Sequence, residues 1–519
     1  MQNKQGMAEE STDYKSELAS SYDDLQYQSQ PIWKTHPENM AALAHLYGLD
    51  PVLPSKAKVI EIGCATGGNL LPMAMNNPDA LFVGVDISEQ QILEAVKTKQ
   101  ELGLKNIFFL HKGIEEVDEE FGLFDYVICH GVFSWVPEHV QEQILEFCNT
   151  RMSANGLAYV SYNTFPLWHH RMPMLKFMRF ISKGKSDIAT VSDTMSKTKM
   201  FLNAISSDTL SYKTSFIGAY EQASKFPEYY LGHEYLEDYN KPFYFNEISD
   251  LLKKYGLDYV ADSEWQRNFG RLFNKELNDK VESYGADRLE REQLFDFIEG
   301  TGFRSSLFSK QKVLGRVDFN RAKDLYLYSS ASYKGQNNGR YEWKQGTSLI
   351  TFDDRFTQNA LSFLSSKGPA GASVLQVMEA ASQGLEFGSH EQMDQFIADI
   401  VRNLIKTNIC VFRVNPALCV DYISDKPMLN PVALGQLKKH EMESTNQLHF
   451  SISVKSEFRK LFAMFDGTRT PLDVQENWGD IFSEEMLNGK KIKHFSSQEK
   501  EELIGKVLSS MKRNAMLIG

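Results

Sequence analysis

Blocks of hydrophobic residues alternate with amphipathic stretches along residues 57–163. Short apolar runs, which are typical of buried parallel strands, occur at 58–63, 82–86, 106–113, 124–131 and 156–163. Patterns with helical spacing lie between them, at 69–76, 88–104 and 137–152. Strands and helices that alternate in this order predict an α/β fold built on a Rossmann-like, doubly wound sheet.

A glycine-rich turn follows the first predicted strand and reads Glu-Ile-Gly-Cys-Ala-Thr-Gly-Gly-Asn at 61–69. Glycines let the backbone turn sharply and approach a ligand without a Cβ in the way. Ala65 departs from the G-x-G-x-x-G loop of dinucleotide sites, and no G-x-x-x-x-G-K-[ST] phosphate loop is present. Asp86 ends the second strand about twenty residues further on, where a Rossmann-type half presents a carboxylate to ribose hydroxyls.

The region around this sheet is expected to contain an arm and an insertion. We expect an N-terminal arm or lid at residues 1–30. We expect the sheet to belong to a cofactor-binding domain over 31–280. A helix at 246–255 and a strand at 257–265 are expected to complete that sheet. The mostly helical residues from about 165 to 245 follow the fifth strand, so they predict an insertion that covers the substrate.

Beyond residue 280 the cofactor motifs stop and two further modules are expected. A helix–helix–helix–strand pattern occupies 355–415, and a second helical series occupies 452–518. These patterns predict winged-helix-like α+β modules over 281–415 and 416–519.

Charge and cysteine usage exclude several classes of function. The 519 residues carry a net charge of -12, which argues against a protein that coats duplex DNA, because phosphate neutralisation needs concentrated Lys and Arg. The five cysteines are scattered without metal-ligand spacing, so we expect reduced thiols and no metal site. No secretory signal and no apolar run of membrane-spanning length are evident. We therefore expect a cytoplasmic protein without membrane insertion.

Three motifs together carry a resemblance to a known family. They are the 61–69 loop with Asp86, the stretch His-Gly-Val-Phe-Ser-Trp-Val-Pro at 130–137, and the stretch Tyr-Asn-Thr-Phe-Pro-Leu-Trp-His at 162–169. The sequence resembles bacterial class I S-adenosylmethionine-dependent methyltransferases that carry a methyltransferase regulatory domain. It looks most like the rickettsial-type lysine methyltransferases of outer-membrane proteins, with Leu167 where that pattern has Gly. The resemblance implies S-adenosyl-L-methionine as cofactor, a regulatory region at about 215–310, and methylation of lysine in a protein substrate such as an outer-membrane protein.

The resemblance also assigns cofactor-binding residues. The methionine part is assigned to Glu61, Gly63, Ala65, Gly67 and Asn69. Asp86 is assigned to the ribose, and the adenine ring is expected beside Ile87, Gln91 and Ile114. The remaining members of the expected cofactor set are Tyr22 in the lid, Cys64, Gly113, His130 and Gly131.

Candidate catalytic residues follow the fourth and fifth strands, because open α/β sheets bind ligands at the carboxyl ends of their strands. His130, Tyr162 and Trp168 are expected to shape the acceptor channel. A general base, if the reaction uses one, would be His130, Tyr162 or His169. A base is not essential, since burial beside a positive sulfonium lowers the pKa of a lysine amine.

Two other functions remain open at this point. One is methylation of a small molecule at oxygen or nitrogen, and the other is a cofactor-binding regulatory protein with DNA-binding winged helices. Nucleic-acid bases are unfavoured as acceptors, because the [DN]-P-P-[YF] tetrapeptide is missing after the fourth strand. The sequence leaves the oligomeric state open, with a homodimer among the options.

Overall fold

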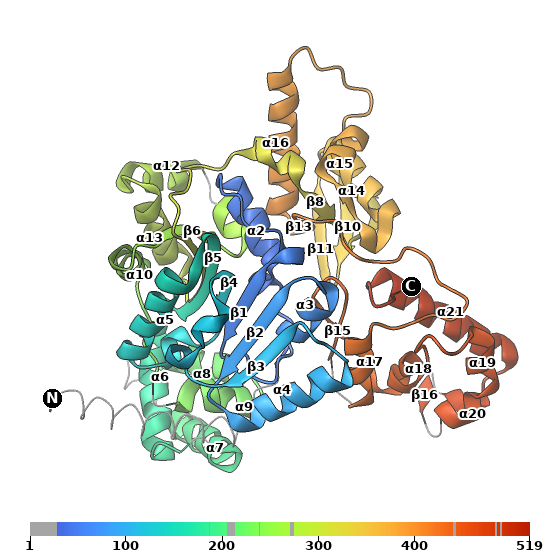
Figure 1. Ribbon diagram of the computed structural model, residues 1–519, viewed down its shortest axis with the longest axis horizontal. Helices are drawn as coiled ribbons and strands as arrows, with labels where there is room; N and C mark the ends of the chain where they lie inside the picture. Colours follow the sequence, from blue (N-terminus) through green and yellow to red (C-terminus); the bar gives the residue numbers. More distant parts are fainter. Residues whose placement is uncertain are drawn as a thin grey trace.

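The computed structural model describes residues 29–185, 187–204, 213–237, 239–269, 275–439, 443–482, 485–487 and 490–518. A twisted sheet with helices on both faces occupies the centre of the molecule, and two smaller modules lie to one side of it (Figure 1). The predicted arm residue Tyr22 lies outside the described residues.

The central sheet has seven strands in the order β3-β2-β1-β4-β5-β7-β6. Strands β1 to β5 pair in parallel, whereas β7 is antiparallel to both β5 and β6. Their bounds are β1 (Lys58–Ile62), β2 (Leu81–Asp86), β3 (Ile107–His111), β4 (Phe124–Cys129), β5 (Met152–Asn163), β6 (Asp258–Asp262) and β7 (Phe303–Ser309). The predicted α/β class and doubly wound sheet are confirmed.

Two hydrophobic cores cover the two faces of this sheet, because successive side chains of a strand point to opposite faces. Val59 of β1 lies in the core beneath α2 (Pro37–Leu46), α3 (Leu70–Asn76) and α4 (Glu89–Glu101). Its neighbour Ile60 lies in the other core, with α5 (Glu138–Arg151) and α10 (Phe245–Lys254). The strand pattern therefore sets which helices pack on which face.

The sheet extends beyond the boundary predicted at residue 280. Helix α13 (Arg288–Glu299) leads into β7, which inserts between β5 and β6. The prediction placed this segment in the middle module because it lies after the last cofactor motif. Strand β7 belongs to the sheet through long-range pairing, which the local pattern does not reveal.

A helical insertion follows β5 and lies along one end of the sheet (Figure 1). It contains α6 (Leu167–Ser182), α7 (Ile188–Ala204), α8 (Lys213–Ala223), α9 (Glu228–Leu231) and a π-helical turn (Gly232–Leu236). These elements share a core of their own, which includes Trp168, Met174 and Met178. The methionines at the start of the insertion are therefore packing residues.

The middle module packs against α2, since Ala42 and Leu46 belong to its core. It contains β8 (Tyr326–Tyr328), α14 (Arg355–Lys367), β12 (Ala372–Ser373), α15 (Val374–Ala381), α16 (His390–Lys406) and β13 (Val411–Arg413), plus a sheet of β9 (Ser332–Asn337), β10 (Arg340–Gln345) and β11 (Ser348–Phe352). The predicted series of three helices and a strand is confirmed, whereas its winged-helix identity stays a prediction.

The C-terminal module is mostly helical and lies beside the β3 edge and α4 (Figure 1). It comprises α17 (Pro431–Lys438), β14 (Glu443–Thr445), β15 (Ser451–Ser453), α18 (Arg459–Ala463), α19 (Pro471–Glu476), α20 (Trp478–Ile481), β16 (Met486–Leu487), β17 (Lys490–Lys491) and α21 (Ser497–Arg513). Within the described parts of the chain, no helix is both long and apolar enough to cross a membrane.

Candidate active site

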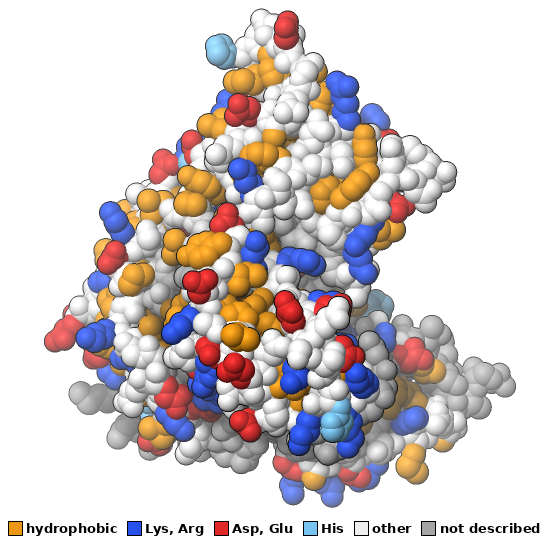
Figure 2. Space-filling model, turned by 90° about the vertical axis from the view of Figure 1, so that its right-hand side faces the viewer, with side chains coloured by type: hydrophobic (Ala, Val, Ile, Leu, Met, Phe, Trp, Pro, Cys, Tyr) orange, Lys and Arg blue, Asp and Glu red, His pale blue; other side chains and the backbone are white. Residues whose placement is uncertain are grey.

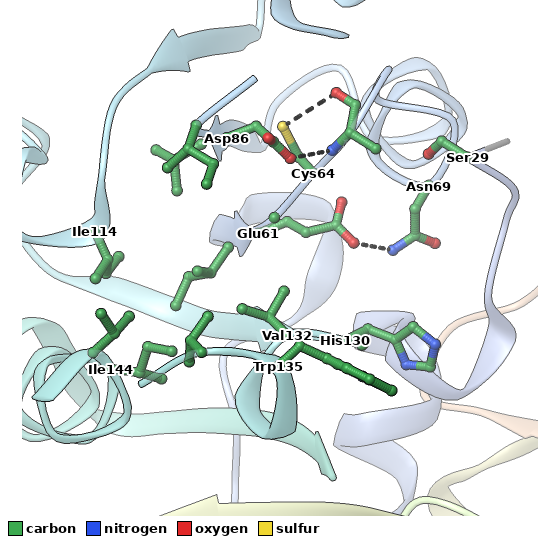
Figure 3. Close-up of a pocket in the computed structure, with 18 of the residues that line it drawn as sticks. Ser29, Glu61, Cys64, Asn69, Asp86, Ile114, His130, Val132, Trp135 and Ile144 are labelled. Carbon is green, nitrogen blue, oxygen red and sulfur yellow. Dashed lines mark hydrogen bonds between the residues drawn. The ribbon is translucent and has the colours of Figure 1, made fainter. Parts of the chain in front are cut away.

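A cavity of about 550 Å³ opens at the carboxyl ends of β1, β2 and β4. Its walls come from the loops that follow these strands and from the segment that begins at Ser29 (Figure 3). The helical insertion also contributes to the wall. Ligand sites of open α/β sheets occupy this position, because the strand order reverses there and leaves a crevice between neighbouring loops. The cavity is therefore the candidate active site.

The loop after β1 forms one wall and depends on a glycine at its start. Gly63 has a φ of +72°, and a Cβ at this position would lie 2.5 Å from Cγ2 of Val132. Its N–H and that of Cys64 donate to the carbonyl of Val85, at 2.8 and 3.1 Å. The loop is thus fastened to β2, which places its backbone along the cavity.

Asp86 connects this loop to the end of β2. Its carboxylate accepts hydrogen bonds from the backbone N–H groups of Ala65 and Ser88, both at 2.9 Å. Burial raises the pKa of Asp86, and these backbone bonds oppose that shift because they favour the charged form. A carboxylate held at this position can accept hydrogen bonds from ribose hydroxyls.

Glu61 and Asn69 form the polar pair in the middle of the cavity wall (Figure 3). Nδ2 of Asn69 donates to Oε1 of Glu61 at 2.7 Å. Oε2 of Glu61 is buried and has no hydrogen-bond partner among the described residues. Burial raises the pKa of Glu61 to about 8. A buried carboxyl oxygen without a partner suits a cationic ligand group such as an amino-acid ammonium.

The opposite wall is apolar and comes largely from α5 and the turn after β3. Ile114 and Ile144 lie across the cavity from Asn69 and Ser29 (Figure 3). Val136 and Val140 extend the same wall. An apolar wall opposite the Asp86 carboxylate fits a purine base that is attached to a ribose. Together with the Glu61–Asn69 pair, this wall suits an adenosine-containing cofactor that has a charged amino-acid part.

A second end of the cavity combines aromatic and ionisable side chains. Trp135, Tyr230, Arg171 and Glu234 line it. Nη1 of Arg171 lies 3.6 Å from Oε1 of Glu234. Burial raises the pKa of Glu234 to about 7, and the charge of Arg171 opposes this shift. The carboxyl group of Glu234 therefore titrates near neutral pH at this end.

His130 also lines the cavity and is neutral at physiological pH. Burial lowers its pKa to about 4, and the charge of Lys34 adds to the effect. Nδ1 of His130 lies 2.8 Å from the hydroxyl of Tyr159, which itself donates to Oγ of Ser305 at 3.0 Å. The Tyr159 oxygen must therefore accept the Nδ1 proton, so Nε2 of His130 carries the lone pair.

Most predicted cofactor residues do line this cavity. They are Glu61, Gly63, Cys64, Ala65, Asn69, Asp86, Ile87, Gln91, Gly113, Ile114, His130 and Gly131. Gly67 is an exception, since it is absent from the cavity wall. It has a φ of +77°, and a Cβ added there would lie 2.5 Å from the ring of Phe109, so the loop requires a glycine at this position.

Three predicted catalytic residues lie outside the cavity wall, and their predicted positions need correction. Tyr162 belongs to the core under α10, and its hydroxyl pairs with Oγ of Ser306 at 3.0 Å. Trp168 packs inside the insertion and donates its Nε1 proton to the carbonyl of Gly302 at 2.9 Å. His169 is exposed, and its Nε2 lies 2.8 Å from the hydroxyl of Tyr244. Residue alternation along β5 turns Asn163, rather than Tyr162, toward the cavity.

Several lining residues were missed because no local pattern marks them. Tyr230 and Glu234, at the second end of the cavity, reach it only when the insertion folds back over the strand ends. Ser29 also lines the cavity, and its Oγ accepts from the N–H of Gly68 at 2.9 Å. Arg171 lies within the Trp-His-x-Arg stretch that follows β5, so its proximity to the site could have been proposed from that motif.

Comparison with known families identifies two domains in the chain. A family described as methyltransferase domain matches residues 60–158, which include the loop after β1 and Asp86. A family described as predicted methyltransferase regulatory domain matches residues 227–310, within the region expected at about 215–310.

Two relatives come from Rickettsia prowazekii. The protein RP789 is 38% identical over 293 residues, which are 55% of this chain and 52% of RP789. The chain thus spans about half the length of RP789. The protein RP028 is 33% identical over 238 residues, which are 45% of this chain and 94% of RP028.

A solved structure shares the overall fold. PKMT2 from Rickettsia typhi, determined in complex with AdoHcy, has a TM-score of 0.81 and covers 95% of this chain and 100% of its own, at 24% identity. The methyltransferase domain match, this shared fold and the polar and apolar walls of the cavity agree on S-adenosyl-L-methionine as the cofactor. The chain belongs to the class I methyltransferases that carry a methyltransferase regulatory domain.

Proposed function

We propose that the chain transfers the methyl group of S-adenosylmethionine to the ε-amine of lysine side chains in a protein. The observation that carries this proposal is the second end of the cavity, where the carboxyl group of Glu234 lies with Trp135 and Tyr230 beside the cofactor walls. A carboxylate attracts an ammonium, and aromatic faces favour a cation that approaches them. This chemistry suits a lysine side chain.

The protein's part in the reaction is alignment and exclusion of water. Bound S-adenosylmethionine supplies a methyl group on a positive sulfonium, and transfer is an in-line displacement. The lysine ammonium, with a reference pKa of about 10.4, must lose a proton before it can attack. Burial beside the positive sulfonium would lower the pKa of that ammonium, and Glu234, whose own pKa is raised to about 7, is the proposed acceptor of its proton.

The resemblance to rickettsial-type lysine methyltransferases extends the proposal to outer-membrane proteins as acceptors, encountered in the cytoplasm. On the face shown in Figure 2, Lys and Arg side chains are interspersed with Asp and Glu side chains among the described residues. A surface of mixed charge suits a protein partner better than a nucleic-acid backbone, which needs concentrated positive charge.

Transfer of tritium from labelled S-adenosylmethionine tests this proposal. The purified chain is incubated with a cell-envelope protein fraction and, separately, with a small-molecule extract. Asp86→Ala serves as the control, because it removes the carboxylate assigned to the ribose while leaving the acceptor end intact. We expect label in a protein band that is stable to base and maps to lysine by mass spectrometry, and about a tenfold or greater loss of label with Asp86→Ala.

Two results would contradict the proposal. Label that enters only the small-molecule extract would favour a small-molecule methyltransferase. Binding of S-adenosylhomocysteine without transfer to either fraction would favour a regulatory protein that senses the cofactor.

A further inference from the structure

The hairpin between β14 and β15 of the C-terminal module reaches the cofactor loop. Its tip is braced by Asn446, whose Oδ1 accepts from the backbone N–H groups of Leu448 and Phe450, at 3.0 and 2.8 Å. His449 at this tip is 1% exposed, and its Nε2 lies 2.8 Å from Oδ1 of Asn69. A side chain 380 positions away in sequence thus contacts a residue that lines the cavity.

Four hydrogen bonds fix the orientation of the Asn69 amide. The backbone N–H of Ile32 donates to Oδ1 at 2.9 Å, and because a backbone N–H can only donate, the oxygen must face it. Nε2 of His449 shares the same oxygen, so it must carry a proton and donate as well. Nδ2 of Asn69 then points the other way and donates to Oγ1 of Thr35 at 2.9 Å and to Oε1 of Glu61 at 2.7 Å.

The surroundings of His449 keep it as a neutral ring protonated at Nε2. Burial lowers its pKa to about 3, and the charge of Arg413 adds to this effect. Nδ1 has no hydrogen-bond partner among the described residues, and the ring packs edge-on against His36 with centroids 4.8 Å apart. The backbone of His449 has a φ of +65°, which is uncommon for a residue with a side chain. This uncommon backbone conformation accompanies the placement of the Nε2 donor at Asn69.

We propose that His449 is a positioning residue of the cofactor site. It orients the amide of Asn69, and through that amide the carboxyl group of Glu61, for the amino-acid part of S-adenosylmethionine. The C-terminal module thereby raises the affinity for the cofactor although it lies outside the sheet. This inference rests on the assignment of Glu61 and Asn69 to the cofactor, and it does not depend on which acceptor is methylated.

Calorimetric titration of the full chain with S-adenosylhomocysteine tests the inference through two matched variants. In His449→Gln the side-chain amide can place an N–H near the position of Nε2, whereas His449→Leu fills similar space without a donor. Both substituted residues must adopt the same left-handed backbone conformation, so the difference in affinity between the two variants reports on the hydrogen bond alone. We expect about a tenfold weaker affinity for His449→Leu and an affinity within about threefold of wild type for His449→Gln.

Lys439→Met is the control for a general loosening of the module. Nζ of Lys439 donates to Oγ1 of Thr98 on α4 at 3.0 Å, a second contact between the module and the sheet domain that does not involve the cofactor loop. We expect its affinity for S-adenosylhomocysteine to equal that of wild type. Equal affinities of His449→Leu and His449→Gln, or a loss in Lys439→Met as large as in His449→Leu, would overturn the inference.

Variants of Asn69 separate this inference from the cofactor assignment itself. In an Asn69→Ala background, His449→Leu should cause no further loss, whereas additive losses would show that His449 does not act through Asn69. Unchanged affinity in both Asn69→Ala and Glu61→Gln would instead refute the cofactor assignment. Should His449→Leu fail to fold, His449→Asn tolerates the left-handed backbone but falls short of Asn69. The same tenfold loss is expected for it, and wild-type affinity would overturn the inference.

Discussion

At the scale of single residues, the protonation state of Glu61 should make cofactor binding depend on pH. Its carboxyl group is buried, Oε1 accepts one hydrogen bond from Asn69, and burial raises its pKa to about 8. The residue is therefore mainly protonated at pH 7 in the ligand-free protein. An ammonium that enters beside Oε2 favours the carboxylate, so binding should release a proton.

We predict that the affinity for S-adenosylhomocysteine rises as the pH increases from 6 to 8 and levels off above the pKa of about 8. Calorimetry at pH 7 in two buffers of different ionisation enthalpy measures the released protons directly. Wild type should release up to about one proton and Glu61→Gln almost none. Asp86 also has a raised pKa, so an unchanged proton release in Glu61→Gln would assign the effect to that carboxylate and contradict the prediction.

Glu234 supplies a prediction for the acceptor end. Glu234→Gln keeps the size of the side chain but removes both the charge that would hold the lysine ammonium and the group that would take up its proton, so kcat/KM for the protein acceptor should fall by at least about tenfold. The affinity for S-adenosylhomocysteine should remain unchanged. Glu228→Gln, on the exposed side of α9 in the same insertion, removes one charge without touching the cavity and serves as the matched control. Equal effects of the two substitutions would argue against Glu234 as an acceptor contact.

At the scale of elements, a buried ion cluster joins α13 to the sheet. Arg304 of β7 is fully buried, and it donates from Nε to Asp296 at 2.8 Å and from Nη2 to Oε2 of Glu292 at 3.0 Å. Nη1 also lies 3.8 Å from a carboxylate oxygen of Asp262 on β6. The charge of Arg304 therefore holds three carboxylates from neighbouring elements.

Removal of that charge should be strongly destabilising, because three buried carboxylates would lose the guanidinium that contacts all of them, although Nη1 of Arg267 still lies 3.7 Å from Asp296. We predict that Arg304→Met lowers the free energy of unfolding by about 3–5 kcal/mol, as measured by urea denaturation. The control Lys506→Met breaks an exposed pair with Glu502 on α21 and should change stability by less than about 0.5 kcal/mol. Comparable losses in both variants would show that the cluster contributes no more than a surface ion pair.

The elements that the sequence predicted well are those with local signals. The strand expected at 124–131 became β4, which begins at the same residue and ends two residues earlier, at Cys129. The capping pattern at Ser88 became a true cap, with its side chain accepting from the N–H of Gln91. Strand β7 was misplaced because its membership depends on antiparallel pairing with β5, far away in sequence. Likewise Gly67 looked like a ligand-contact glycine, although its environment is set by Phe109 on another strand.

At the candidate site, too, the residues that local sequence patterns did not predict are those placed by long-range packing. The cofactor wall follows two short motifs, so most of its residues could be assigned from the family resemblance that those motifs carry. Glu234 and Tyr230 come from a helical insertion whose path over the strand ends has no short motif, and His449 arrives from another module. Long-range packing, which a single sequence does not encode in a local pattern, places these residues.

At the scale of the whole molecule, the contact between the C-terminal module and the cofactor loop predicts a response that spans both parts. Binding of S-adenosylhomocysteine should slow amide hydrogen exchange in residues 61–69 and also in the hairpin at 446–450, since Asn69 and His449 share a hydrogen bond. Helix α16, which has no part in the cavity wall, provides the internal control. Protection that stops at the sheet domain would contradict the coupling.

The central claim is that the cavity methylates lysine amines of a protein, and chemical blocking of the acceptor tests it most directly. One sample of a cell-envelope protein fraction has its lysine amines acetylated, and a matched sample has only its thiols alkylated. Both are incubated with the chain and tritiated S-adenosylmethionine. The account predicts that the alkylated sample keeps its protein label and the acetylated sample loses it. Full labelling of the acetylated sample would contradict the claim.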